Sequence, residues 1–508
     1  MDTTLRDGEQ TDGVSFSAFE KLQLTRFLLE KLNVNRVEIA SARVSDGELE
    51  NVREVFKWAR EKGQDRRIEI LGFCDHKASV NWILDAGGSA INLLTKGSRR
   101  HCELQLRKTL AEHLEDIRKT VQYADEQGVR VNVYLEDWSN GYLHSPDYVR
   151  EITGELLKLP VNRVLLPDTL GILDPEEVYA GIRDLMDLYP DLQADFHGHN
   201  DYNLVVANCI AAVRAGVRGL HVAVNGLGER AGNAPLESVV TALHDKLKIG
   251  TSVVEKEITA ASRLVETFSG KRIQSNRPVV GQDVYTQTAG IHADGDKKND
   301  LYVNPILPER FGRQRVYALG KLAGRASVEN NLKMLGIELQ PEREKLLLDR
   351  IKQLGEQKKI VTADDLPFLI QDLFGAHGDA EMLKIKDAVI TTNYSGSPSA
   401  HIEVEYRGDL YTGDAEGDGG YDAFMNALRE IAAKIELEIP RLVDYEVRIP
   451  PGGKTDALVE TFITWENKAG GRSFRTVGVD PDQVVAAIKA TEKMLNRMLL
   501  PAKIFAGS

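Results

Sequence analysis

Short apolar runs alternate with amphipathic stretches from residue 35 to about residue 230. Each run is rich in Val, Ile or Leu, and the stretch that follows it repeats its apolar positions at helical spacing. The strands that this pattern predicts lie at residues 2–5, 36–41, 68–73, 91–95, 131–136, 164–169, 194–199 and 220–225. Eight strands alternating with helices over about 250 residues are typical of a (β/α)8 TIM barrel, whose chemistry lies where the strands end. We therefore expect an α/β fold with a catalytic barrel over residues 1–260.

The run at residues 2–5 is the least typical of the eight. A barrel strand usually has about five or six residues, and Asp2 directly follows Met1. We therefore expect the native protein to start upstream of Met1, which the mass of its N-terminal peptide would test.

The alternation stops after residue 250. Residues 261–380 read as linker helical subdomains with a polar connection near 294–304. Residues 381–508 then show three strands and a helix twice, with helices at 421–435 and 481–495 and second-repeat strands at 442–447, 457–465 and 474–477. We expect a C-terminal α+β domain with a duplicated βββα unit, and the seam between such halves is a natural ligand site.

Composition and charge limit the partners and the cellular compartment that we expect for this chain. The chain has 508 residues, 42% of them apolar, and a net charge of -13, which disfavours nucleic acid and anionic membranes as partners. No apolar run approaches the ~18 residues of a membrane span, and no signal segment opens the chain. Cys74, Cys102 and Cys209 lack metal-ligand spacing and indicate reduced thiols. We expect a soluble cytoplasmic protein with no nucleic-acid or membrane partner.

The segment HGHND at residues 197–201 is the strongest chemical signal. Two histidines at i and i+2 on a strand point to the same face, so His197 and His199 can reach one divalent ion. Two histidines buried there without partners would be costly. Asp7, in DTTLRDGEQ at residues 2–10, offers a carboxylate, and Asn233, in GLGERAGN at 226–233, could complete the site. This donor set suits Mg²⁺, Mn²⁺ or Zn²⁺.

Four segments together resemble the family of barrel enzymes that contains 2-isopropylmalate synthase, homocitrate synthase, citramalate synthase and the related acyl-CoA lyases. They are DTTLRDGEQ at 2–10, HGHND at 197–201, GLGERAGN at 226–233 and GIHADG at 290–295, in that order. The resemblance covers nearly the whole chain, and the repeated C-terminal domain resembles the amino-acid-sensing regulatory domain of the synthases. It implies that Asp7, His197 and His199 bind the metal, with Asn233 near or in the shell.

The resemblance also implies the reaction, in which the acetyl group of acetyl-CoA joins a 2-oxo acid. Such an acid can chelate the ion through a carboxylate oxygen and its keto oxygen. Arg6 then stabilises the alkoxide that develops, an effect on the order of 3 kcal/mol in comparable sites. Thr169 is expected to hydrogen-bond the substrate carboxylate, and a strand-end cap is its alternative role.

A base must also remove a methyl proton from acetyl-CoA. We favour His292, paired with Asp294 and Tyr302, with Glu136 holding or helping it. In the family this subdomain reaches the partner subunit's barrel, which implies a homodimer with a shared active site.

Three inward strand-end residues bear on the 2-oxo acid. Leu71, Leu94 and Tyr134 are bulky and apolar, which disfavours a second carboxylate, and a phenol ring shrinks the pocket toward a methyl group. NVYLEDWSN at 132–140 and NLLTKGS at 92–98 also look like the citramalate synthase branch of the family. We expect pyruvate as the substrate, with weak activity on 2-oxobutyrate, because apolar pockets discriminate by only ~1–3 kcal/mol per methylene. The alternative substrate is 2-oxoisovalerate.

The C-terminal repeat offers a candidate effector site. EGDGGYD at 416–422 opens a helix whose amides can bind a carboxylate, while acidic side chains bind an amino group. We expect isoleucine as the effector, and the residues expected to contact it are Tyr421, Asp422, Leu442, Tyr445, Ile449 and Val459. A purely structural dimer domain is the alternative.

Two other classes are weighed against a synthase. A lyase of the hydroxymethylglutaryl-CoA type resembles proteins with a reactive Cys in the loop where this chain has Glu229, Arg230 and Ala231. A non-catalytic amino-acid sensor would be free to lose the metal ligands, yet every expected ligand is present.

Overall fold

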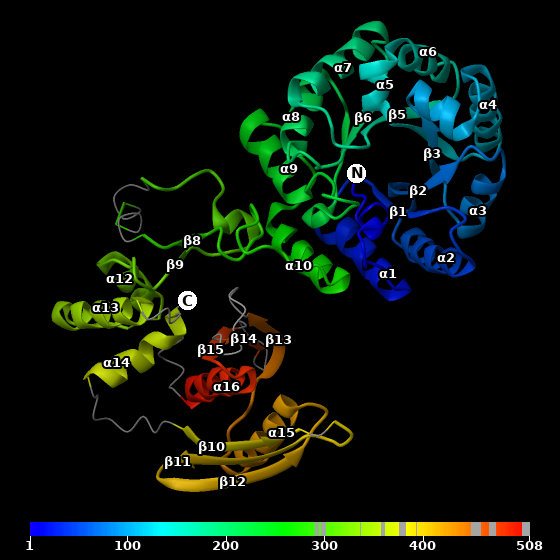
Figure 1. The fold of residues 1–508 in the computed structure, drawn as a ribbon. Coiled ribbons are helices and arrows are strands. Elements are labelled where there is room, and N and C mark those ends of the chain that lie inside the picture. The colour runs from blue at the N-terminus through cyan, green and yellow to red at the C-terminus, as the bar shows by residue number, and fades with distance from the viewer. Residues whose placement is uncertain are drawn as a thin grey trace. The chain divides into compact units, whose positions relative to one another are not determined.

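The computed structural model describes residues 1–289, 294–295, 301–335, 337–356, 361–374, 383–392, 394–448, 459–466 and 474–499. These residues form two compact units. The first contains Met1–Tyr285 and Asn304–Gln314, and the second contains Thr286–Val303 and Arg315–Ser508. Figure 1 shows the helices and strands of both units.

The first unit is built on a curled sheet of seven parallel strands that follow one another in chain order. The strands are β1 (Val37–Ser41), β2 (Ile68–Phe73), β3 (Ala90–Lys96), β4 (Arg130–Glu136), β5 (Val161–Asp168), β6 (Ala194–Gly198) and β7 (Gly219–His221). Each pairs in parallel with the next. The expected barrel fold is confirmed, and the helices surround the strands (blue to green in Figure 1).

The expected strand at residues 2–5 is reduced to a single bridging residue. Asp2 bridges in parallel to Val37, the first residue of β1, and to Val222, which directly follows β7, and this closes the ring of strands. The chain then turns at once, because the side chain of Asp2 accepts hydrogen bonds from the amide and hydroxyl of Thr4, at 3.0 Å each. The prediction of a full strand was therefore wrong, since the polar side chains after Met1 favour a turn.

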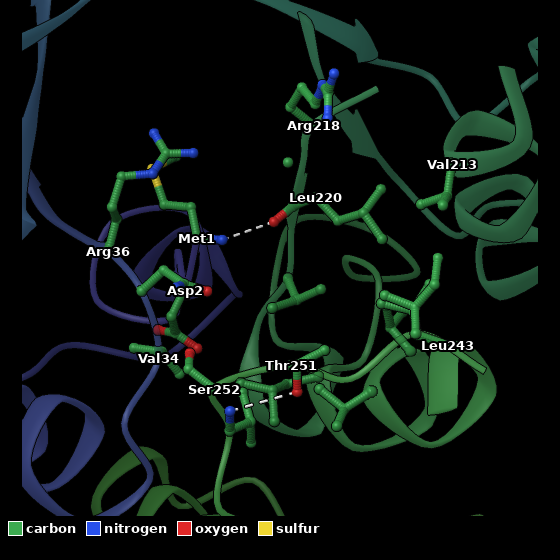
Figure 2. A pocket seen from close by; sticks show the side chains of 18 of the residues that line it. Met1, Asp2, Val34, Arg36, Val213, Arg218, Leu220, Leu243, Thr251 and Ser252 are labelled. Carbon is green, nitrogen blue, oxygen red and sulfur yellow. Dashed lines mark hydrogen bonds between the residues drawn. The ribbon is translucent and has the colours of Figure 1, made fainter. Parts of the chain in front are cut away.

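A pocket of about 590 Å³ lies at the N-terminal ends of the strands, beside this closure. The amino group of Met1 donates to the carbonyl oxygen of Leu220 at 2.7 Å, and Arg36 and Leu243 contribute to the walls (Figure 2). The pocket lies at the end of the barrel opposite to the one where polar side chains gather.

The helices that cover the sheet begin at recognisable caps. Thr109 and Asp174 each accept the third amide of their helix, while Glu112 and Glu177 accept the cap amide in return. The helices of this unit are α1 (Ala18–Arg26), α2 (Asp46–Glu61), α3 (Ala78–Ala86), α4 (Leu110–Glu126), α5 (Trp138–His144), α6 (Pro146–Leu156), α7 (Pro175–Leu188), α8 (Val205–Ala215), α9 (Leu236–Ala242) and α10 (Ile258–Ser269).

Alternate residues of each strand divide between the two sides of the sheet. On β4, Val131, Val133 and Leu135 join the apolar core between sheet and helices. Asn132 and Tyr134, which alternate with these residues, face the barrel interior. There, Nδ2 of Asn132 donates to Oδ1 of Asn92 on β3 at 2.7 Å. The core that stabilises the fold thus lies outside the ring of strands, and the interior is free to carry polar groups.

The second unit begins with a two-stranded parallel pair, β8 (Thr286–Gln287) and β9 (Val316–Tyr317). Three helices follow, α12 (Arg325–Met334), α13 (Pro341–Glu356) and α14 (Leu366–Phe374). Leu332, Leu347, Ile351 and Leu366 form their common core. This confirms the expected helical middle region.

Two βββα units complete the chain. The first consists of β10 (Lys384–Thr391), β11 (Ser399–Tyr406), β12 (Asp409–Glu416) and α15 (Gly420–Lys434). The second consists of β13 (Arg441–Arg448), β14 (Val459–Glu466), β15 (Phe474–Asp480) and α16 (Gln483–Leu499). Both sheets are antiparallel, and Phe424, Leu428, Trp465 and Leu495 lie in one core that the two units share. The expected duplication is confirmed.

None of the helices among the described residues has the length and apolarity that a membrane crossing requires. The three cysteines are free thiols, and burial raises the pKa of Cys74 and of Cys209 to about 12.

Candidate metal centre

Two imidazoles and one carboxylate converge at the C-terminal end of the barrel. The Nε2 atom of His197 lies 3.4 Å from Nε2 of His199 and 3.1 Å from Oδ2 of Asp7. His197 is on β6 and His199 follows that strand, so their shared direction arises from strand alternation. All three residues are buried, and one ligand atom from each lies within 4.8 Å of the others.

Asp7 reaches this point through a tight turn. The carbonyl oxygen of Thr3 accepts the amides of Arg6, Asp7 and Gly8 at 2.9–3.2 Å, which folds the segment back over the barrel. Gly8 lies close to the loop that follows β7, because a Cβ at this position would be only 3.1 Å from Cβ of Leu227. The segment at residues 2–10 therefore packs directly against that loop.

Asn233 lies beside His199, to which it is joined by an antiparallel bridge. Its amide nitrogen donates to the carbonyl oxygen of Leu227 at 2.8 Å, while its Oδ1 is buried without a hydrogen-bond partner among the described residues. Gly228 makes room for the side chain, since a Cβ there would lie 2.4 Å from Nδ2 of Asn233. The glycine-rich loop thus holds an amide oxygen beside the three other donors.

These donors fit a divalent ion. Oδ1 of Asp7 and Oδ1 of Asn233 are buried oxygens with no partner among the described residues, and such atoms are costly unless something binds them. Burial alone would raise the pKa of Asp7, but Arg6 and the two histidines outweigh it and hold that pKa well below its usual range. Burial, and then His197, lower the pKa of His199 to about 4. An ionised carboxylate beside a neutral imidazole is the protonation state that metal binding needs.

Arg6 lies next to these donors, with its guanidinium between two carboxylates. Its Nε donates to Glu38 of β1 at 2.6 Å, and its NH2 group lies 3.2 Å from Asp7. Burial would lower the pKa of Arg6, and the two carboxylates raise it instead, so the group is a fixed cation. Glu38 was not predicted as a site residue, although a charged residue between Val37 and Ile39 in a barrel strand is an unusual signal.

An apolar wall stands beside His197. Leu71, Tyr134 and Leu165 form a small buried cluster against which Leu94 packs. The ring of Tyr134 meets the ring of His197 edge to face, with centroids 6.0 Å apart. The structure therefore brings together the three residues expected to line the substrate pocket. It adds Leu165, which pairs with Tyr134 across β4 and β5.

Two further expected residues lie at the ends of neighbouring strands. The hydroxyl of Thr169 accepts the amide of Asp137 at 2.9 Å, so it acts as a strand-end cap and keeps its own proton for another acceptor. Glu136 pairs with the ammonium of Lys96, which is opposite it on β3. Lys96 was not predicted to belong to the site. Its position at the end of β3 is the feature that could have indicated it.

The proposed acid/base group His292 lies outside the described residues. Asp294 and Tyr302 belong to the second compact unit, and Tyr302 is partly exposed. A Cβ at Gly295 would lie 2.5 Å from the ring of Tyr302, so the backbone at Gly295 packs against that ring. The role of this group and the shared active site stay predictions.

Known proteins match this chain over nearly its full length. The HMGL-like family matches residues 1–265, the homocitrate synthase post-HMGL domain-like family 279–359, and the LeuA allosteric (dimerisation) domain 360–499. A putative (R)-citramalate synthase of Methanopyrus kandleri is 32% identical over 98% of this chain and 96% of its own length. A probable 2-isopropylmalate synthase of the same organism is 34% identical, covering 98% and 97%. An (R)-citramalate synthase of Methanocaldococcus jannaschii is 31% identical, covering 98% and 99%.

The chain belongs to the HMGL-like family. Because the LeuA domain also matches this chain and its synthase relatives align with 98% of it, it is an alkylmalate synthase, an acyltransferase of branched-chain amino acid biosynthesis. The buried Asp7, His197 and His199 are consistent with the divalent metal site typical of this family.

The C-terminal domain of this alkylmalate synthase contains a pocket of about 690 Å³. Tyr421, Asp422 and Leu442 line it, as expected, together with Arg429 and Arg441, which were not expected. Arg429 is eight residues after Tyr421 on α15, a helical spacing that could have indicated it.

The remaining expected effector residues are placed differently. The ring of Tyr445 is 5.2 Å from that of Tyr421, Val459 is buried on β14 and does not line the pocket, and Ile449 lies outside the described residues.

Proposed function

We propose that this alkylmalate synthase is an (R)-citramalate synthase. It condenses acetyl-CoA with pyruvate and water, giving (R)-citramalate and CoA, the first step of a threonine-independent route to isoleucine. The observation that carries the proposal is the apolar wall of Tyr134, Leu71, Leu94 and Leu165 beside His197. The apolar side chains of this wall suit a methyl group and disfavour a second carboxylate, which would lose its hydration against them.

Each donor group has a definite task in this reaction. Asp7, His197, His199 and Asn233 would hold the ion, which would supply a Lewis acid for the keto group of the 2-oxo acid. Thr169 offers its free hydroxyl proton to the substrate carboxylate. Arg6, fixed by Glu38, faces the keto oxygen and stabilises negative charge there as the new carbon–carbon bond forms.

The remaining steps move protons. His292 removes a proton from the acetyl methyl group, and the resulting carbanion attacks the keto carbon of pyruvate. The alkoxide takes up a proton, and water then cleaves the thioester, releasing CoA as its thiol. Glu136, paired with Lys96 at the barrel mouth, assists His292, and Asp294 with Tyr302 orients it. We expect a homodimer in which the segment with His292 serves the partner's barrel.

A 2-isopropylmalate synthase is the second candidate. The probable 2-isopropylmalate synthase of Methanopyrus kandleri is 34% identical to this chain, slightly more than the putative citramalate synthase of that organism at 32%. Its substrate would be 2-oxoisovalerate, whose branched chain needs the space that the Tyr134 ring takes.

Thiol release with a panel of 2-oxo acids tests the choice of substrate. With acetyl-CoA and Mn²⁺, kcat/KM should be highest for pyruvate and about tenfold or more lower for 2-oxobutyrate, because the pocket must exclude one methylene. The value for 2-oxoisovalerate should be lower still. A preference for 2-oxoisovalerate would overturn the proposed substrate and leave the reaction class intact.

We also propose that isoleucine is the effector and binds the pocket at α15. Arg429 and Arg441 can pair with its carboxylate and Asp422 with its amino group, while Tyr421 and Leu442 contact the side chain. Calorimetric titration should show isoleucine binding at least about tenfold more tightly than leucine. Binding of neither amino acid would contradict the effector site, whereas tighter binding of leucine would favour the 2-isopropylmalate synthase.

A further inference from the structure

The hydroxyl group of Tyr134 is held deep inside the barrel by a residue of a distant strand. Its oxygen lies 2.9 Å from Nδ1 of His221 on β7, and the two rings meet edge to face with centroids 5.5 Å apart. Both residues are almost completely buried. A phenol placed this way cannot rotate freely, because moving the ring would leave a buried hydroxyl without a partner.

A buried carboxylate lies behind His221. Nε2 of His221 is 3.5 Å from Oδ2 of Asp195 and makes no hydrogen bond among the described residues, whereas Asp195 pairs with Arg36 and, at 3.2 Å, with Arg163. Gly219 leaves the space that this carboxylate fills, since a Cβ there would lie 2.4 Å from its Cγ. The position of Asp195 is therefore fixed by two cations and by the missing side chain of Gly219.

Two neighbours contact the phenol oxygen. Nδ1 of His221 lies 2.9 Å away, and the hydroxyl donates to Oε2 of Glu38 at 3.5 Å, an oxygen that also accepts Arg6 at 2.6 Å. The contact with His221 is the shorter of the two, and the imidazole tautomer decides which of its two groups is the donor.

The Tyr134 ring is also a wall of the metal centre. It faces His197 on one side, and the guanidinium of Arg6 lies 5.9 Å from its centroid. We propose that His221 is a positioning residue that sets substrate size, because it holds the Tyr134 ring against the space beyond the methyl group of pyruvate. This inference rests on the proposed function and deepens it.

Tyr134→Phe tests the inference directly, because it keeps the ring and removes the hydroxyl. The ratio of kcat/KM for pyruvate to kcat/KM for 2-oxobutyrate should fall about fivefold or more, as expected when one buried hydrogen bond is lost. The fall should come from a lower KM for 2-oxobutyrate. The matched control is Tyr189→Phe, which removes a hydroxyl that donates to the carbonyl oxygen of Arg150 at 2.8 Å, between helices α6 and α7.

Two variants of His221 separate positioning from simple packing. His221→Asn keeps an acceptor near the place of Nδ1 and should retain most of the wild-type ratio. His221→Leu removes the acceptor and should lower the ratio as far as Tyr134→Phe does. Combining His221→Leu with Tyr134→Phe should add little, since both remove the same bond.

The outcomes distinguish this inference from the proposed function. If wild type prefers 2-oxoisovalerate, the proposed substrate is wrong. If wild type prefers pyruvate but Tyr134→Phe keeps the wild-type ratio, with both substrates slowed equally or only the melting temperature lowered, the positioning role is wrong. A change of the same size in Tyr189→Phe would also contradict it.

Discussion

Replacing His197 with alanine is expected to abolish both metal binding and activity. His197 contributes one of three converging donors, and its Nε2 is within 3.4 Å of the other two. Loss of a partner that only orients a ligand typically costs ~10–100-fold in metal affinity, so loss of a ligand should cost more. Mn²⁺ affinity by calorimetry and thiol release with pyruvate are the two measurements.

His244→Ala is the matched control for this prediction. His244 is exposed in the same unit and contacts Glu255 and Arg310, away from the metal donors. It should retain both metal affinity and turnover. If His197→Ala still binds one Mn²⁺ with wild-type affinity, the ion does not lie at Asp7, His197 and His199.

Replacing His292 with alanine should give a different defect. Metal and pyruvate should still bind, because their proposed contacts come from the barrel, while turnover should fall by ~10²–10⁴-fold, the usual contribution of a general base. Calorimetry for Mn²⁺ and pyruvate, together with thiol release, separates the two effects. Loss of metal binding would assign His292 another role. His401→Ala, on the exposed side of β11, is the control.

Mixing the two inactive variants tests the shared active site. If His292 serves the partner's barrel, a heterodimer of His197→Ala and His292→Ala has one intact site, and random exchange should restore about a quarter of wild-type activity in a closed dimer. If each subunit serves itself, mixing restores nothing.

Residues that act through local motifs were predictable from the sequence. His197 and His199 follow from the two-residue period of a strand, and the alternation of strands and helices predicts the barrel itself. Tyr134 and Leu94 were recognised as inward because their strands have clear ends.

Residues whose role depends on strand register were missed. Leu165 lies in the run 164–167, where apolar neighbours leave the inward side undefined, and only its pairing with Tyr134 brings it to the pocket. Glu38 and His221 act on Arg6 and Tyr134 from strands far away in the sequence. The reduction of the first strand to Asp2 reflects a competing turn, which the period of apolar residues does not report.

The central claim is that this site joins the methyl carbon of acetyl-CoA to the keto carbon of pyruvate. Carbon-13 NMR of the products from methyl-labelled acetyl-CoA, unlabelled pyruvate and Mn²⁺ tests it most directly. The label should appear as the methylene carbon of citramalate, next to a quaternary carbon, and should be absent with His197→Ala. Label that remains in free acetate would mean hydrolysis without condensation and would contradict the claim.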